Sequence, residues 1–114
     1  MKRSIVRIAL MSLLAIVLVV PTADALEPLG TIETHRVRMV DGNAFRPARI
    51  TISRGDRVRW VNRDNANHTT TSNGGLWDET LAPGERFTRR FRRAGTFNYE
   101  CTLHFGMTGR IVVR

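Results

Sequence analysis

Three residues near the C-terminus carry side chains that bind soft metal ions. Cys101, His104 and Met107 offer a thiolate, an imidazole and a thioether within seven residues of chain. Sulfur ligands together with imidazole suit copper in both oxidation states, and a trigonal set of two histidines and one cysteine with a weak axial methionine is a known copper geometry. The segment therefore predicts a mononuclear copper site that needs one more histidine.

Two histidines lie farther upstream, His35 and His68. His68 follows an alternating segment that ends at Asn62, so its loop can meet the 101–107 loop at one end of a β-sandwich. His35 stands between charged residues at the start of an alternating segment, where polar side chains usually face solvent. We expect His35 to be exposed, and we predict four ligands: His68, Cys101, His104 and Met107.

Cys101 is the single cysteine of the chain, so it cannot form an internal disulfide. A lone thiol in an oxidising compartment reacts unless it is buried or occupied, and a metal would occupy it. The plainer alternative makes Cys101 and Met107 core residues and His104 a loop residue. The metal site is favoured because it explains four ligand types at compatible positions at once.

The first 25 residues have the layout of a secretory signal peptide. A positively charged start (residues 1–7) precedes an apolar run from Ile8 to Val20 and the small-residue pattern Ala23-Asp24-Ala25. We predict cleavage after Ala25 and a periplasmic location. An uncleaved membrane anchor is the alternative, although the run of 13 residues is shorter than the roughly 20 that span a bilayer as a helix.

Residues 26–114 form a segment long enough for one domain with one core. The chain has 114 residues and a net charge of +8, and this segment retains 15 basic against 9 acidic residues. Such a charge often indicates nucleic-acid binding, but export argues against it. We expect an acidic protein partner or an anionic surface, with a merely solvated arginine face as the alternative.

Apolar residues alternate with polar ones at the strand period of two in several short runs, and turn-forming residues separate these runs. The pattern predicts an all-β fold, an antiparallel Greek-key β-sandwich, with Trp60 and Trp77 in its core. Two polar segments, 62–68 and 73–81, are predicted to be loops. The clearest alternating runs include residues 36–39, 50–53, 57–60, 97–101 and 111–113.

Several motifs resemble those of the cupredoxins, in particular the plastocyanin, amicyanin and pseudoazurin branch. The similarity covers nearly all of residues 26–114, and the short Cys-x₂-His-x₂-Met spacing is amicyanin-like. Many relatives have proline at the place of Leu103, and asparagine at the place of Thr69. A hydrogen bond between Thr69 and Thr102 would still link the two ligand loops. The similar segments are Gly55–Asn62, Asn67–Thr69, Leu81–Glu85, Gly95–Cys101 and Cys101–Met107.

The resemblance implies a type 1 copper site and one-electron transfer, with His104 as the exit beside Phe105 and Leu103. The expected partner is a redox protein (a cytochrome, dehydrogenase or reductase), and the expected form is a monomer. An enzyme is not expected, because an oxidase or nitrite-reducing site needs more imidazoles than the chain offers. Two alternatives remain: a periplasmic copper carrier or storage protein with the same ligands, and a metal-free adhesive sandwich.

Overall fold

The structure, a computed structural model, describes residues 4, 12–19 and 30–114. The chain divides into two units, Met1–Gly30 and Thr31–Arg114. In the described part of the first unit, residues 12–19 have neither helix nor strand. Where the structure describes the chain, it contains no helix of the length and apolarity that a membrane span requires. The predicted signal peptide lies largely outside the described residues and stays a prediction.

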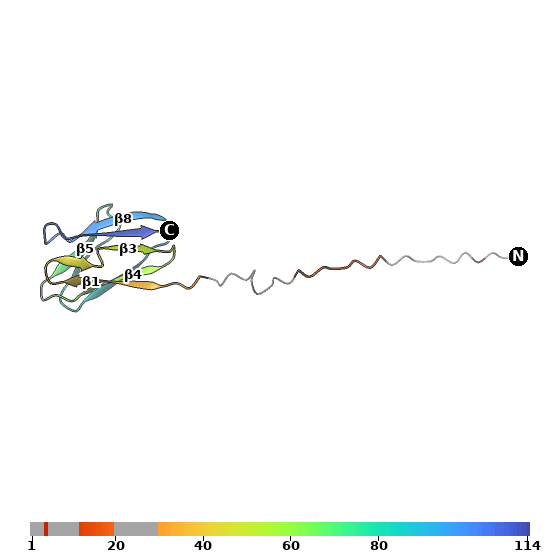
Figure 1. Ribbon diagram of the computed structural model, residues 1–114, viewed down its shortest axis with the longest axis horizontal. Coiled ribbons are helices and arrows are strands. Elements are labelled where there is room, and N and C mark those ends of the chain that lie inside the picture. The colour runs from red at the N-terminus through yellow and green to blue at the C-terminus, as the bar shows by residue number, and fades with distance from the viewer. Residues whose placement is uncertain (1–3, 5–11, 20–29) are drawn as a thin grey trace. The chain divides into compact units, whose positions relative to one another are not determined.

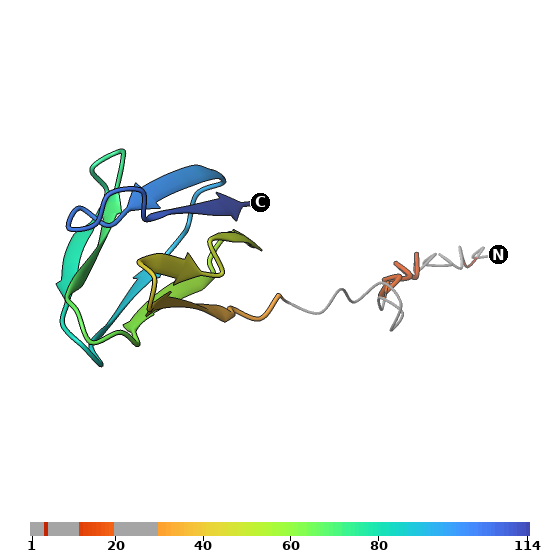
Figure 2. The same cartoon turned by 60° about the vertical axis from the view of Figure 1, so that its left-hand side comes forward.

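The second unit is built from strands arranged in two layers (Figures 1 and 2). One sheet has the order β2-β1-β4-β7, and the other has the order β3-β9-β8-β5-β6. The strands are β1 (Thr34–Val40), β2 (Ala44–Arg46), β3 (Arg49–Ile52), β4 (Arg57–Asn62), β5 (His68–Ser72), β6 (Asp78–Leu81), β7 (Arg86–Arg90), β8 (Gly95–Glu100) and β9 (Thr108–Val113).

The predicted β-sandwich is confirmed, but its sheets are mixed rather than purely antiparallel. Strand β1 pairs in parallel with β4, and β3 pairs in parallel with β9. Parallel neighbours require a crossover connection, and here the chain between β1 and β4 passes through β3 in the other sheet. Period-two alternation identifies a strand and its buried face, but it carries no information on the direction of the neighbouring strand.

The core lies between the two sheets and is centred on aromatic side chains. Trp60 is completely buried, and its ring centroid lies 5.6 Å from that of Trp77, 5.8 Å from Phe87 and 5.5 Å from Tyr99. These contacts confirm the prediction that Trp60 and Trp77 are core residues. They also bring the core next to Cys101, which is two residues after Tyr99 and therefore on the same face of the chain.

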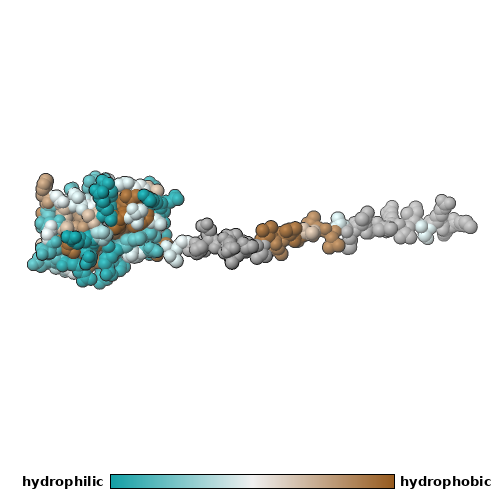
Figure 3. All heavy atoms as spheres, viewed as in Figure 1, coloured by the Kyte–Doolittle hydropathy of each residue, from teal (hydrophilic) through white to brown (hydrophobic). Residues whose placement is uncertain are grey.

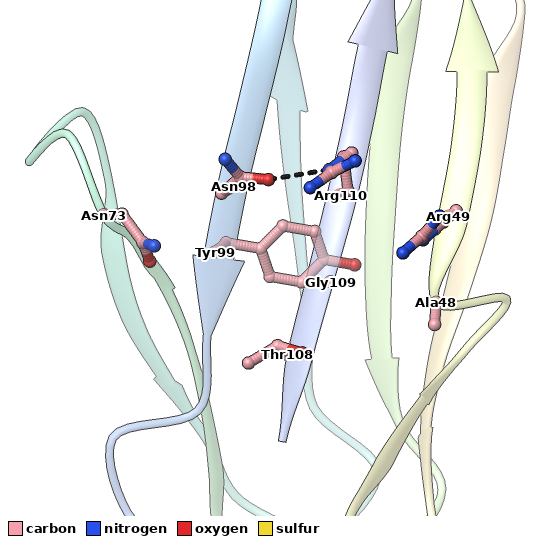
Figure 4. Close-up of a pocket in the computed structure, with 8 residues that line it drawn as sticks. All are labelled: Ala48, Arg49, Asn73, Asn98, Tyr99, Thr108, Gly109 and Arg110. Atoms are coloured by element: carbon pink, nitrogen blue, oxygen red, sulfur yellow. Dashed lines mark hydrogen bonds between the residues drawn. The ribbon is translucent and has the colours of Figure 1, made fainter. Parts of the chain in front are cut away.

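Tyr99 lies across Gly109, its register partner in β9 (Figure 4). A surface hollow of about 260 Å³ is lined by both residues and by the neighbouring Asn98 and Arg110, whose side chains share a hydrogen bond of 2.9 Å. Burial raises the pKa of Tyr99 to about 12, so the phenol stays protonated at neutral pH. The Tyr99 ring can lie there because residue 109 is a glycine and has no side chain.

The two predicted loops are only partly confirmed. Residues 63–67 form the connection between β4 and β5, but His68 is the first residue of β5 rather than a loop residue. Strand β6 lies inside the predicted loop 73–81. Strand β5 has the sequence HTTTS, whose buried positions are polar, so it shows no apolar alternation that could reveal it.

His35 is partly buried, which corrects the expectation of an exposed side chain. Its Nε2 lies 2.9 Å from Oδ2 of Asp56, whose carboxylate also accepts the backbone N–H groups of Glu33 and Ser53 at 3.1 Å each. Asp56 is buried in the turn before β4. This cluster therefore ties the beginning of β1 to that turn, at the opposite end of both strands from Asn62.

Asp56→Asn is expected to reduce stability in a pH-dependent way. The hydrogen bond with His35 is the main reason that the pKa of Asp56 is lowered, with the two backbone N–H groups adding to it against burial. A carboxylate with a lowered folded pKa stabilises the fold above its unfolded pKa of about 3.9, and the stabilisation is lost as the pH falls through the folded value.

Urea unfolding between pH 7 and pH 3 measures this effect. The free energy of unfolding of Asp56→Asn should lie below that of the wild type at pH 7, and the gap should narrow as the pH falls below about 4. Asp41→Asn, in an exposed turn where the carboxylate contacts the N–H of Gly42, is the matched control. A gap that stays constant with pH would contradict the role given to the carboxylate.

Candidate metal centre

Three of the four predicted ligands converge at the end of the sandwich where β4 and β8 finish. The Sγ atom of Cys101 lies 3.8 Å from Nδ1 of His68 and 3.4 Å from Nδ1 of His104. The two imidazole ring centroids are 4.5 Å apart. His68 and Cys101 are buried, and His104 is partly buried. The structure thus brings together residues that are up to 36 positions apart in the sequence.

The spacing of these donor atoms fits a metal ion. Bonds of about 2.0 Å to nitrogen and 2.3 Å to sulfur, at about 120° in a plane, place the two donors roughly 3.7 Å apart. The two observed nitrogen–sulfur distances lie on either side of this value. One thiolate and two imidazoles are a donor set that accepts copper. The residues present therefore fit a copper ion both in geometry and in chemistry.

The loop that carries His104 and Met107 is closed by its own backbone. The N–H of Cys101 donates to the carbonyl of Met107 at 2.9 Å, and the N–H of Met107 donates to the carbonyl of His104 at 3.3 Å. Gly106 has a φ of 79°, a conformation that few residues other than glycine adopt at low cost. Met107 is buried in the same apolar cluster as Cys101, so the fourth predicted ligand lies within the core at this end.

Asn62 holds the loop that leads to His68. Its side-chain amide is completely buried and donates to the carbonyls of Ala66 at 2.7 Å and Leu81 at 2.9 Å. Its Oδ1 accepts the N–H of Asp64 at 2.9 Å. A buried amide with these partners fixes the path of residues 63–67, because each bond would be costly to leave unmade.

Asp64 contacts the side of His68 that faces away from the cysteine. Its Oδ2 lies 2.8 Å from Nε2 of His68, so a proton on Nε2 leaves Nδ1 free to bind a metal. The hydrogen bond with His68 is the largest reason that the pKa of Asp64 is lowered, and the N–H of Asn65 adds to it. Sequence reasoning missed Asp64, since an aspartate four residues before a histidine in a loop is not a recognisable signal.

The cysteine sulfur and the two ligand segments are joined by hydrogen bonds of Thr69. Its N–H donates to Sγ of Cys101 at 3.3 Å, and its Oγ1 accepts the N–H of Thr102 at 2.8 Å. The hydroxyl oxygens of Thr69 and Thr102 are 3.1 Å apart, which confirms the predicted threonine link. The network continues through Thr71 at 3.0 Å to Asp78 at 2.8 Å, two contacts that the sequence did not suggest.

The surface next to His104 is apolar. Leu103 is 55% exposed and Phe105 is fully exposed, on either side of the partly buried imidazole. Most buried apolar residues of this domain pack in the core between the sheets, whereas Leu103 and Phe105 expose their side chains to solvent. An exposed apolar rim around one ligand is suited to brief contact with another protein.

Asp64→Asn is expected to raise the reduction potential of the copper-loaded protein. The negative charge of Asp64, transmitted through His68, stabilises the more positive oxidation state, and its removal favours the reduced ion. If the substitution lowers the affinity for Cu(II) relative to that for Cu(I) about tenfold, the potential rises by about 59 mV for this one-electron couple. Cyclic voltammetry measures it. Asp78→Asn, at the far end of the threonine network, is the control, and an equal rise there would contradict this explanation.

Comparison with known proteins agrees with this geometry. The sequence model described as "Cupredoxin-like domain" matches residues 9–113. The chain is 33% identical over 84 residues to a chloroplastic plastocyanin of Tetradesmus obliquus, covering 61% of this chain and 58% of that one. It is 34% identical over 65 residues to an amicyanin of Paracoccus denitrificans, covering 52% and 50%. The alignments thus span between half and three fifths of these two relatives.

A solved structure is similar as well. A purple cupredoxin from Nitrosopumilus maritimus superposes with a TM-score of 0.66 at 26% sequence identity, covering 70% of this chain and 99% of that one. The family match extends over most of the chain, and the structural match covers nearly all of that neighbour. The residues at the converging donor atoms are of the types that a copper site of this fold requires. The chain therefore belongs to the cupredoxin family.

Proposed function

We propose that this protein is a one-electron carrier with a single type 1 copper ion held by His68, Cys101, His104 and Met107. The observation that carries the proposal is the convergence of the cysteine sulfur with two Nδ1 atoms at 3.4 and 3.8 Å in a largely buried setting. Bound copper would supply the Cu(I)/Cu(II) couple, and the protein would supply a nearly fixed set of donors.

The surrounding residues support electron transfer in particular. The backbone bonds of the 101–107 loop and the bonds of Thr69 hold the donors in place, so little rearrangement need accompany a change of charge. The partly exposed His104, beside Leu103 and Phe105, offers an edge through which a docked redox protein could exchange an electron. A carrier that hands over copper itself would instead need a ligand that opens readily.

We further propose that residues 1–25 direct export to the periplasm and that the mature form is a monomer. The partner would be an acidic redox protein such as a cytochrome, dehydrogenase or reductase. We do not propose catalysis, because the remaining histidine of the described residues, His35, is bound to Asp56 at the other end of β1. Fractionation of an expressing bacterium tests the location: retention of the whole chain in the inner membrane would contradict cleavage.

Copper titration of the purified protein tests the function. An intense thiolate-to-copper absorption band should rise to one equivalent of Cu(II) and disappear on reduction, and the loaded protein should exchange electrons rapidly with a small redox protein. His68→Ala should lose the band, whereas His35→Ala should keep it. A colourless complex would contradict the copper site. A coloured protein that releases its copper to a chelator faster than it exchanges electrons would favour the copper-carrier alternative.

Met107→Leu is expected to keep the colour and raise the reduction potential. An axial thioether binds weakly and favours the oxidised ion, so its replacement by an apolar side chain of similar volume removes a ligand without emptying the core. Voltammetry and the visible spectrum of the loaded variant measure both effects. Complete loss of colour in a folded variant would contradict the axial role.

A further inference from the structure

Arginine side chains gather at the end of the domain opposite the metal centre. Strand β7 ends there and β8 begins there, and the backbone bonds Arg54 N–H to Arg114 carbonyl (3.0 Å) and Phe91 N–H to Asp56 carbonyl (2.9 Å) join the neighbouring segments. We call this region the arginine-rich end. It comprises Arg54, Arg57, Arg89, Arg90, Arg92, Arg93 and Arg114.

The positive charge of this end is hardly compensated. Glu33 and Asp56 are the acidic side chains nearby, and the carboxylate of Asp56 is taken up by His35 and by backbone N–H groups. Among residues 30–114, every ion pair within 4.0 Å involves a histidine, and no arginine contacts a carboxylate at that distance. Six of the eight described carboxylate side chains lie elsewhere on the domain. Carboxylates therefore do not neutralise the guanidinium groups of this end, although Arg89 is partly buried and Arg90 donates to the carbonyl of Gly55 at 3.0 Å.

An apolar groove lies among these arginines. It has a volume of about 540 Å³, and its lining combines the apolar side chains of Leu76, Phe91 and Phe97 with the arginines at residues 89–93. Leu76 is 53% exposed. The guanidinium of Arg89 is held over the rings of Trp77 at 5.0 Å and Phe91 at 4.8 Å. On the face shown in Figure 3, an apolar area likewise lies between strongly hydrophilic side chains.

The arginine-rich end and the metal ligands lie at opposite ends of strand β8. Strand β8 leads from the arginine-rich end to Cys101 over six residues, which is about 20 Å of extended chain. Strand β1 begins at the same end, and 13 residues separate it from the apolar run that ends at Val20. The first strand of the domain therefore begins beside the arginines, at the end opposite the metal ligands.

We propose that the arginine-rich end binds the anionic surface of a lipid bilayer and turns the metal centre away from it. Arginine forms paired hydrogen bonds with phosphate, and apolar side chains between cations can enter the headgroup layer. A protein oriented in this way would keep Leu103 and Phe105 free for a redox partner. The proposal extends the proposed function by an orientation, but it needs no copper, so the two can fail separately.

The surface fits lipid better than an acidic protein. The arginines come from three separate stretches of chain around one end, namely residues 54–57, residues 89–93 and the C-terminal residue. An acidic redox partner would be expected to dock near His104, the ligand that exchanges the electron, whereas these arginines lie at the opposite end of β8. A fluid anionic surface has no fixed geometry to match, and each arginine near it adds about fivefold to binding.

Vesicle sedimentation with the purified full-length chain, with and without copper, tests the proposal. Binding to vesicles of phosphatidylcholine alone measures any contribution of the apolar N-terminal run, and vesicles with one quarter phosphatidylglycerol measure the charge effect. The anionic vesicles should bind more protein than the phosphatidylcholine vesicles do. This excess binding should fall as the salt concentration rises. Arg92→Gln/Arg93→Gln should lower the excess about 30-fold at low salt.

Arg46→Gln/Arg86→Gln is the matched control, because both residues are exposed, carry the same charge and lie toward the metal-centre end. It should change the excess only a fewfold. Equal losses in the two variants, or an excess that survives Arg92→Gln/Arg93→Gln, would overturn the proposal. So would binding to an acidic polypeptide with no binding to anionic vesicles. Visible spectra of the loaded variants test the copper site independently.

Discussion

Cys101→Ser is expected to abolish the thiolate-to-copper absorption of the loaded protein and its one-electron exchange. The sulfur lies within 3.8 Å of both Nδ1 atoms, and Cys101 is 3% exposed, so water cannot take the place of the sulfur easily. Loss of an outer partner of a metal ligand typically costs 10–100-fold in affinity, and loss of the thiolate itself should cost more than about 100-fold. Copper titration with competing chelators measures the change.

Thr102→Ser provides the control for this experiment. It alters the neighbouring residue but keeps both the hydroxyl and the backbone N–H that contact Oγ1 of Thr69. This variant should retain the colour and bind copper within a fewfold of the wild type. Because serine is close to cysteine in size, Cys101→Ser should still fold, which thermal unfolding of the metal-free protein can verify. A blue, redox-active Cys101→Ser protein would contradict the proposed site.

The parts of the site that sequence could predict are those whose chemistry is rare. A single thiol followed by an imidazole and a thioether at short spacing has few explanations, and the structure places Cys101 and His104 as this chemistry requires. The choice of His68 over His35 depended on where each would lie in a sandwich. In the structure Nδ1 of His68 lies 3.8 Å from Sγ of Cys101, whereas His35 contacts Asp56 at the opposite end of β1.

The supporting contacts could not be predicted, because they depend on three-dimensional proximity between common residue types. Asn62 and Asp64 look like ordinary turn residues in the sequence, yet one fixes the loop before His68 and the other bonds its ring. Strand β5 was missed for a related reason. Its buried threonines satisfy one another and their neighbours by hydrogen bonds, such as that from the indole N–H of Trp77 to Thr70 at 2.9 Å.

Gly109→Ala is expected to destabilise the fold by about 3 kcal/mol, toward the upper end of the usual range for overpacking. A Cβ at this position would collide with the Tyr99 ring, at 2.7 Å from Cε1 and closer still to Cζ and the hydroxyl oxygen. The ring cannot move aside freely, because it packs edge-on against Phe45 at 4.7 Å and against Trp60 at 5.5 Å. Urea unfolding measures the loss.

A double-mutant cycle shows whether the collision with Tyr99 is the cause. Tyr99→Leu removes the ring atoms that the new methyl group would meet, so Gly109→Ala should cost at least about 1 kcal/mol less in that background. Tyr99→Phe keeps the ring and should not relieve the collision. It is also expected to be nearly neutral by itself, because the buried hydroxyl has no hydrogen-bond partner among the residues that the structure describes. Additive costs for Gly109→Ala and Tyr99→Leu would mean that the alanine acts through the backbone of β9. Since β9 follows directly after Met107, such a backbone change should also shift the reduction potential, whereas a collision confined to the ring should leave it nearly unchanged.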